Sequence, residues 1–356
     1  MLRQTLLLFI LVIGLLFLSP LQATSEAPAG MDDKISCFTY HKFGEEEQYP
    51  STSISTELFE EHLEYLEQND YTVLTLGKAL QRLHSENDLP ERTAVLTIDD
   101  AYKSIKTKAL PLLQEYGYKA TIFASTNHVG GKNYLSWEDL QALQDQGFEI
   151  GNHSHSHAHF VNFDQDRRVD EFEQDLEKSQ RLFQENLNKT VELYAYPFGE
   201  YCPGMQKILQ KHGYKAAAAQ RSGIIHKDSD QFALPRFPMN QSYGKMEKFT
   251  EKIGMYPLGV MDVDPKNPVL SDPKEPEFTL TVQNKLINTD GMQCFLNGKR
   301  NCKIETEAKN STMFIRVRAD KKMESRRSTF TITAPSREGQ KWFWHTRVLI
   351  TPEYGE

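Results

Sequence analysis

The chain has 356 residues, of which 39% are hydrophobic and 25% charged, and its formal net charge at pH 7 is −8. This composition is that of an ordinary globular protein, which excludes a disordered chain and a bundle of membrane helices. The acidic balance argues against a nucleic-acid partner, because binding to phosphates favours a basic surface. The length suits one large domain and one small domain.

The N-terminus has the pattern of a secretory signal. Arg3 precedes an apolar run at residues 6–18, and the segment Ser19-Pro20-Leu21-Gln22-Ala23 that follows ends in a small residue suited to cleavage. We expect residues 1–23 to be a signal peptide and residues 24–34 to lead into the first domain. The alternative is an uncleaved membrane anchor, which the short apolar run disfavours. The protein is therefore expected to be exported, periplasmic or extracellular, with no transmembrane span after cleavage.

Between residues 35 and 260, short apolar runs alternate with amphipathic segments. The apolar runs, interpreted as buried strands, lie at residues 35–40, 71–74, 94–96, 120–123, 148–150, 191–195 and 215–219. Predicted helices begin near Thr56, Ala79, Ser104, Ser136, Arg167 and Pro203. This alternation predicts an α/β domain of parallel β/α units, and six or seven such units suit a barrel.

Three polar clusters each follow a predicted strand: Asp99 and Asp100, the histidine-rich residues 153–157, and residues 196–199. Active sites of parallel barrels and open sheets form at this carboxyl end of the strands. Two adjacent carboxylates repel each other, and a bound cation relieves the repulsion. Carboxylate with imidazole is the ligand set of catalytic zinc and related divalent metals.

Each cluster alone has a simpler interpretation. An Asp-Asp pair is more often a turn or a helix cap, and a histidine-rich run can be an adventitious metal site. Their occurrence together, each after a strand, favours a catalytic site.

Residues 97–100, 151–157 and 197–199 resemble, in order and spacing, the first three motifs of the polysaccharide deacetylases, carbohydrate esterase family four. The resemblance covers roughly residues 35–240 and is strongest to the circularly permuted poly-N-acetylglucosamine deacetylases of biofilms. It implies a distorted (β/α) barrel with fewer than eight strands. It also implies an enzyme that hydrolyses N-acetyl groups of N-acetylglucosamine-type polysaccharides.

The resemblance assigns roles to individual residues. Asp100, His153 and His157 would bind a divalent metal, zinc or else cobalt, nickel or iron, and Asp99 would be the base that activates the metal-bound water. The backbone N–H of Phe198 would lie beside the oxyanion. The expected substrate and oxyanion segment consists of Tyr196, Pro197, Phe198 and Gly199.

Two departures from the family pattern concern the acid–base residues. The arginine usually found two residues before the motif proline is Ala195 here, and Arg236 is a candidate replacement, with a plain surface salt bridge as the alternative. The usual late strand ending in Leu-x-His is not visible, and the strand that ends at His41 resembles its permuted equivalent. His41 is then the expected general acid, and the alternative is a histidine that only satisfies a loop backbone.

Beyond residue 260 the pattern changes. Residues 261–277 contain four prolines and no apolar period, which predicts a linker. Residues 278–356 alternate apolar and polar side chains in short runs, which predicts a small antiparallel β-sandwich. This domain, with Trp342 and Trp344, could hold glycan or dock on the barrel, and we favour packing for both rings.

The four cysteines permit disulfides in an exported protein. Cys294 and Cys302 flank Asn297 and Gly298, a strong hairpin-turn signal, so we expect a disulfide between them. Cys37 and Cys202 can pair or stay as buried thiols, and the sequence leaves both open.

Two other functions stay open at this stage. Metal-assisted chemistry cleaves esters as readily as amides, so an O-acetyl polysaccharide esterase is one alternative. A non-catalytic glycan-binding protein is the other, although retention of Asp99, which metal binding does not need, argues against it. The expected partner is an acetylated polysaccharide, whereas the polymer, its linkage, the native metal and the oligomeric state are left open.

Overall fold

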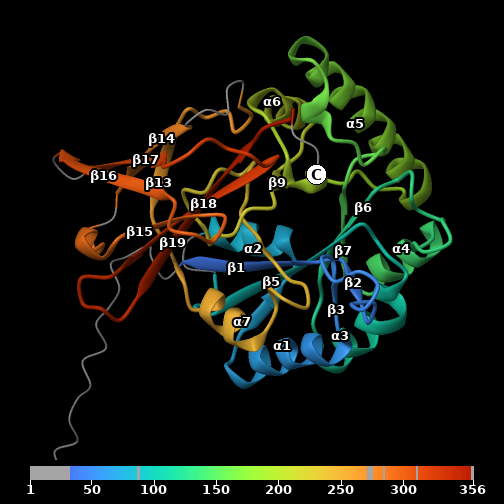
Figure 1. Ribbon diagram of the computed structural model, residues 1–356. Helices are drawn as coiled ribbons and strands as arrows, with labels where there is room; N and C mark the ends of the chain where they lie inside the picture. The colour runs from blue at the N-terminus through green and yellow to red at the C-terminus, as the bar shows by residue number, and fades with distance from the viewer. Residues whose placement is uncertain (1–32, 86–88, 271–275, 284, 310–311, 354–356) are drawn as a thin grey trace, which may run out of the picture.

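The computed structural model describes residues 33–85, 89–270, 276–283, 285–309 and 312–353 (Figure 1). The predicted signal peptide at residues 1–23 lies outside these residues. None of the helices in the described ranges combines the length and the apolar character that crossing a membrane requires.

Parallel strands form the centre of the first domain. In sheet order they are β1 (Lys34–Tyr40), β5 (Thr93–Asp99), β6 (Thr121–Ala124), β7 (Glu149–Asn152), β8 (Leu193–Ala195) and β9 (Ala216–Ala218). Strand β4 (Thr72–Leu74) adds to β5 in parallel, and β10 (Ile225–His226) pairs with β1 in antiparallel orientation. All residues of β5 and β6 are buried, as expected for parallel strands that are covered on both faces.

A short late segment joins the two edges of this sheet. Leu234 forms a parallel bridge to Ala218 of β9, and β11 (Phe237–Pro238) pairs in parallel with β1. The six central strands and this closing segment form a distorted barrel with fewer than eight strands, so the predicted fold class is confirmed. Strands β2 (Lys42–Phe43) and β3 (Ser53–Ile54) form a separate parallel pair.

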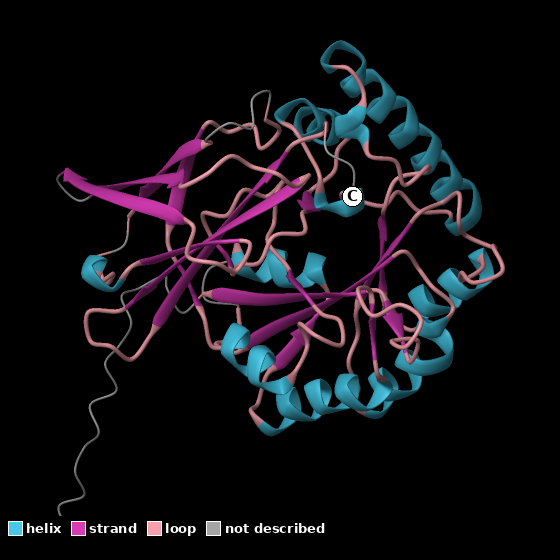
Figure 2. Cartoon of the chain, viewed as in Figure 1, coloured by secondary structure: helices cyan, strands magenta, loops and turns pink. Residues whose placement is uncertain are grey.

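Helices cover the outside of the barrel (Figure 2). They are α1 (Thr56–Gln68), α2 (Leu76–Leu83), α3 (Leu110–Glu115), α4 (Trp137–Asp145), α5 (Gln165–Leu187), α6 (Pro203–Lys211) and α7 (Met246–Ile253). The helix predicted to begin near Ser136 starts with a capping box, because Ser136 Oγ accepts from Asp139 N and Asp139 Oδ2 accepts from Ser136 N. The helix predicted from Ser104 instead opens with a π-helical turn, Ile105–Ala109, because Pro111 has no N–H to continue the α-helical ladder.

Two four-stranded sheets form the second domain, beside the barrel in Figure 1. One has the order β12 (Tyr256–Pro257), β19 (Trp342–Ile350), β18 (Arg327–Pro335), β15 (Gln293–Leu296). The other has the order β13 (Val260–Asp264), β14 (Glu277–Val282), β17 (Thr312–Ala319), β16 (Cys302–Lys309). The predicted β-sandwich is confirmed, except that β12 joins β19 in parallel.

The start of the predicted linker is wrong. Strand β13 occupies its first residues and pairs with β14, so the second domain begins before residue 261. A register shift between Val260 and Asp262 interrupts the alternation of side chains there, which hides the strand from a period-two pattern. The packing prediction holds for Trp344, whose ring contacts that of Phe237, but is wrong for Trp342, which is 40% exposed.

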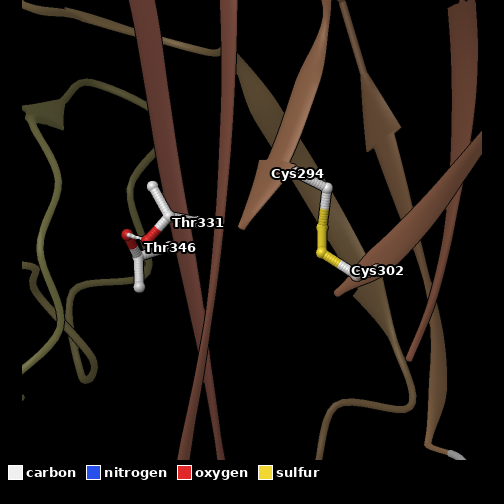
Figure 3. The surroundings of a disulfide bond; sticks show 4 residues. All are labelled: Cys294, Cys302, Thr331 and Thr346. Carbon is white, nitrogen blue, oxygen red and sulfur yellow. Dashed lines mark hydrogen bonds between the residues drawn. A yellow bond between two sulfur atoms is a disulfide. The ribbon is translucent and has the colours of Figure 1, made fainter. Parts of the chain in front are cut away.

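The predicted disulfide is present between Cys294 and Cys302 (Figure 3). Cys294 lies in β15 and Cys302 is the first residue of β16, so the bond joins the two sheets of the sandwich. The hydroxyls of Thr331 and Thr346, 3.4 Å apart, link β18 to β19. Asn297 and Gly298 have positive φ angles, as a two-residue hairpin turn requires. Cys37 and Cys202 are buried free thiols, and burial raises the pKa of Cys37 to about 12.

His62 of α1 fixes the end of β1. Its Nε2 lies 2.5 Å from Gly244 O and its Nδ1 lies 3.0 Å from the Tyr40 hydroxyl, and its ring stacks on Phe249 at 4.0 Å. A carbonyl only accepts, so Nε2 carries the proton and Nδ1 accepts from Tyr40. This locks the residue that immediately precedes His41.

Burial lowers the pKa of His62 to about 4, so acid should destabilise the fold through this residue. The unfolded chain takes up the proton near pH 6.5 and the folded chain does not, so the free energy of unfolding falls as pH drops from about 6.5 to about 4, by about 3 kcal/mol. We expect His62→Gln to lose less stability than the wild type between pH 7 and pH 4, measured by urea unfolding with a chelator present. The exposed His84→Gln serves as the control, and equal losses in all three proteins would contradict the prediction.

Candidate active site

The loops that carry the three motifs leave the same edge of the barrel. Asp99, the last residue of β5, lies opposite Phe123 of β6, and Asn152, the last residue of β7, lies opposite Ala124. Ala195, the last residue of β8, lies opposite Ala218 of β9. The carboxyl ends of these strands are therefore level, and the polar residues that follow them converge.

The structure brings the three predicted metal ligands together. Asp100 Oδ1 lies 3.5 Å from His153 Nε2 and 3.2 Å from His157 Nε2, and the three ligand atoms lie within 4.8 Å of one another. Asp100 Oδ1 is buried and has no well-aligned hydrogen-bond donor among the described residues. A buried carboxylate oxygen that faces two imidazole nitrogens fits a divalent cation, so the residues present suit the metal that the resemblance implies.

The orientation and charge of His153 also suit a metal ligand. Its Nδ1 donates to Ala195 O at 2.7 Å, which leaves the Nε2 lone pair directed at Asp100. Burial lowers the pKa of His153 to about 4, so the ring is neutral at neutral pH, as metal binding requires. Burial alone would raise the pKa of Asp100, but the surrounding histidines hold it below its usual value, so this group stays a carboxylate.

Asp99 is held by Arg236 in a two-pronged ion pair. Arg236 Nη1 lies 2.7 Å from Asp99 Oδ1, and Arg236 Nη2 lies 2.8 Å from Asp99 Oδ2. The guanidinium also donates to Ala219 O and to Thr97 Oγ1, each at 3.1 Å. Arg236 is completely buried, so the alternative of a surface salt bridge is wrong.

The arginine reaches this point because it lies in the segment that closes the barrel, between Leu234 and β11. Burial would raise the pKa of Asp99, but the charge of Arg236, with smaller contributions from His153 and His41, holds it below its usual value. Asp99 is therefore an oriented carboxylate beside the three metal-ligand candidates.

His41 lies at the same edge, directly after β1. Its side chain is half-buried, and its charge contributes to the lowered pKa of both Asp99 and Asp100. The structure thus places the predicted acid within electrostatic reach of both carboxylates.

The predicted oxyanion segment divides into a packing residue and a turn. Tyr196 is completely buried and its hydroxyl donates to Phe232 O at 3.0 Å, so its side chain faces the core and is not available to a substrate. In the following turn, Gly199 N donates to Tyr196 O and Glu200 N donates to Pro197 O. The first amides of a helical turn have no acceptor within it, which makes Phe198 N–H the donor of this segment that fits the oxyanion role.

Backbone strain gathers in these loops. Among the described residues, the non-glycine residues with positive φ in the motif loops are Asp100, Ala101, Ser154, His157 and Phe198. The others are Asp70, Asn188 and Asn297, whose short polar side chains tolerate this conformation. Left-handed backbone costs on the order of 1–2 kcal/mol per residue, and such strain concentrates at functional sites.

Four residues around the turn were missed by the sequence analysis: His159, Glu200, Arg326 and Arg327. Arg326 bonds to Glu200, 126 residues away, and Arg327 bonds to the Phe198 carbonyl, 129 residues away. Neither pair is close in sequence or part of a motif, so no local signal could have found them.

Level strand ends, a cluster of metal-ligand type and a buried carboxylate–guanidinium pair define a hydrolase site on a (β/α) barrel. Residues 86–217 match the family model for polysaccharide deacetylases. The chain is 27% identical over 212 residues to YxkH of Bacillus subtilis (strain 168), a protein whose name assigns it to the polysaccharide deacetylases, covering 60% of this chain and 72% of that one.

A second relative is the poly-beta-1,6-N-acetyl-D-glucosamine N-deacetylase of Staphylococcus aureus (strain MRSA252), 25% identical over 204 residues, covering 54% of this chain and 70% of that one. The deacetylase PplD of Streptococcus pyogenes, solved with acetate, shares the fold, with a TM-score of 0.56 and 22% identity over 62% of this chain and 98% of that one. Residues 86–217 therefore form a polysaccharide deacetylase domain, and these similarities support a hydrolase that acts on carbon–nitrogen bonds other than peptide bonds.

The ligand assignment predicts separate effects for binding and turnover. His153→Ala and His157→Ala should each lose bound zinc, measured by elemental analysis after dialysis, because each removes one of three ligands. Asp99→Asn should keep its zinc and lose turnover by roughly a hundredfold or more, since it removes the base and not a ligand. The neighbouring His155→Ala is the control and should keep both. Full zinc content in both alanine variants of His153 and His157 would refute the assignment.

Proposed function

We propose that the protein is a divalent-metal-dependent N-deacetylase that hydrolyses the N-acetyl groups of N-acetylglucosamine-type polysaccharides. The observation that carries this proposal is Asp99, oriented by a buried arginine beside the Asp100, His153 and His157 cluster. The name of the S. aureus relative supports this substrate class.

Three tasks must be met at neutral pH: activation of water, stabilisation of the oxyanion, and protonation of the leaving amine. When bound at Asp100, His153 and His157, a divalent cation would polarise the acetyl carbonyl and acidify water. Zinc suits the mixed carboxylate and imidazole set, with cobalt, nickel or iron as alternatives.

Asp99 takes the proton of the attacking water. The two hydrogen bonds from Arg236 fix both of its oxygens in the plane of the guanidinium, which keeps the carboxylate ionised and in one orientation. Phe198 N–H donates to the oxygen of the acetyl group as negative charge develops on it.

His41 donates a proton to the leaving nitrogen as the carbon–nitrogen bond breaks. The oxygen of water becomes part of the released acetate, one proton of that water goes to Asp99, and the sugar leaves as a free amine. An amide nitrogen is a poor leaving group without a proton, so the site needs an acid separate from Asp99.

The setting of the reaction is part of the same proposal. The signal pattern at residues 1–23 and the exported poly-N-acetylglucosamine class that the chain resembles both favour a periplasmic or extracellular enzyme. The substrate there is an acetylated polysaccharide, and no nucleic-acid partner is proposed.

Acetate release from a panel of acetylated glycans tests the function. We expect release from β-1,6-linked N-acetylglucosamine oligomers, with a rise in free amines equal to the acetate released. Acetate released only from O-acetylated glycans, with no free amine, would make the protein an O-acetyl esterase. Binding of the oligomers with no release from any glycan would make it a glycan-binding protein.

His41→Ala should separate amide from ester hydrolysis. We expect turnover on the N-acetyl oligomer to fall roughly a hundredfold or more, with zinc content unchanged, because general acid catalysis contributes this much. An aryl acetate ester, whose leaving group needs no proton, should lose much less. Near-normal turnover of the variant on the N-acetyl oligomer would show that the acid is another residue.

A further inference from the structure

The turn that carries Phe198 is held from the second domain. Arg327, the first residue of β18, donates from Nη1 to Phe198 O at 2.5 Å and from Nη2 to Gln220 O. Phe198 and Gln220 lie on the loops that follow β8 and β9, so one guanidinium binds two neighbouring loops of the barrel. These loops also touch at Gly199, where an added Cβ would lie 2.3 Å from Gln220 N.

The preceding residue supports the same turn. Arg326 donates from Nε and Nη2 to the two carboxylate oxygens of Glu200, each at 2.8 Å, and Nη2 also lies 2.8 Å from Asn162 Oδ1. Glu200 is only 4% exposed and lies 2.9 Å from His159 Nδ1. The ring of His159 in turn stacks on the ring of Phe198, with centroids 3.5 Å apart and an angle of 11°.

The conformation of the turn explains why it needs outside support. Phe198 has φ of 58° and ψ of 4°, a left-handed backbone that a residue with a bulky side chain rarely adopts. Such a residue persists only when its surroundings over-determine it. Here the carbonyl, the side chain and the following carboxylate of the turn are all contacted by the network that begins at Arg326 and Arg327.

We propose that the C-terminal β-domain completes the active site, with Arg327 as a positioning residue for the Phe198 N–H and the pair of Arg326 and Glu200 as its support. The inference rests on the proposed deacetylase function, in which that N–H faces the developing oxyanion. The second domain then acts on the reaction through the backbone of the barrel, without contacting the substrate.

Attachment of the domains does not depend on Arg327 alone. The rings of Phe237 and Trp344 meet across the interface at 5.9 Å, and Arg221 Nη1 lies 3.4 Å from Thr346 O. Strand β12, which follows the barrel in sequence, pairs with β19. Removing the Arg327 guanidinium should therefore loosen the turn and leave the domains docked.

The test compares Arg327→Met and Arg327→Lys in the full-length chain. We expect Arg327→Met to lower kcat on the N-acetyl oligomer roughly 10- to 100-fold, with KM and zinc content little changed, because a misplaced oxyanion donor acts mainly in the transition state. Arg327→Lys, which keeps a cationic donor, should recover part of the loss. Glu200→Gln should also lower kcat, by a smaller factor than Arg327→Met does. The exposed Arg316→Met on β17 is the matched control and should have no effect.

Hydrogen–deuterium exchange provides a readout that does not depend on activity. The amides of residues 198–200 should exchange at least about tenfold faster in Arg327→Met, while the strands of both domains keep wild-type rates. Unchanged kcat and unchanged exchange at this turn would overturn the proposal, as would a uniform rise across both domains. If Arg327→Met does not fold, Arg327→Lys and Glu200→Gln decide by the same measurements.

A wild-type enzyme that releases no acetate from any glycan would refute the proposed function separately. The exchange of residues 198–200 would then still show whether Arg327 holds the turn, and wild-type exchange in the variant would refute the positioning role on its own.

Discussion

The buried pair of Asp99 and Arg236 is the interaction on which the arrangement of this site depends. A carboxylate and a guanidinium removed from water are tolerated only when each satisfies the other and their remaining hydrogen-bonding groups find partners. Arg236 meets this condition with four hydrogen bonds, to Asp99, Thr97 and Ala219, that connect β5, the residue after β9 and the closing segment. Removing one partner of such a pair typically costs about 3–5 kcal/mol, so the orientation of Asp99 and the closure of the barrel are maintained by the same bonds.

The guanidinium that orients Asp99 comes from a different position than the family pattern predicts. The arginine that the family commonly places before its third motif is replaced by Ala195, yet the Ala195 carbonyl still orients His153 at 2.7 Å. A backbone contact is independent of the side chain, so the orientation of His153, a proposed metal ligand, does not depend on which residue stands at position 195. The guanidinium comes instead from Arg236 in the segment that closes the barrel between β9 and β1, and from there it reaches both oxygens of Asp99.

The sequence analysis succeeded where local patterns determine structure. The parallel strands, the helix start near Ser136 and the hairpin disulfide followed from apolar runs and from cap and turn residues. The convergence of Asp100, His153 and His157 followed from the resemblance of their motifs to the family. It failed where tertiary contacts or a lost hydrogen bond decide. The register shift in β13 removed the alternation on which strand prediction relies, and Pro111 changed the helix opened by Ser104.

Among the site residues, too, those that depend on tertiary contacts could not be found from local sequence patterns. Arg236 could be proposed because a strand-like segment surrounds it, but its burial depends on how the barrel closes, which no local pattern records. Arg326 and Arg327 carry no motif and lie in another domain. Their contacts exist only because the two domains meet at the turn after β8.

The residues of the proposed site are spread along the chain, and some of them lie outside the span that matches the family model. The span that matches the family model, residues 86–217, contains Asp99, Asp100, His153, His157 and Phe198, but His41, Arg236 and Arg327 all lie beyond it. A descendant that lost one of these three residues would keep the whole matched span, with the three proposed metal ligands inside it. If these three residues have the roles proposed above, a paralogue that binds metal but is inactive can arise by a single substitution outside the most recognisable segment.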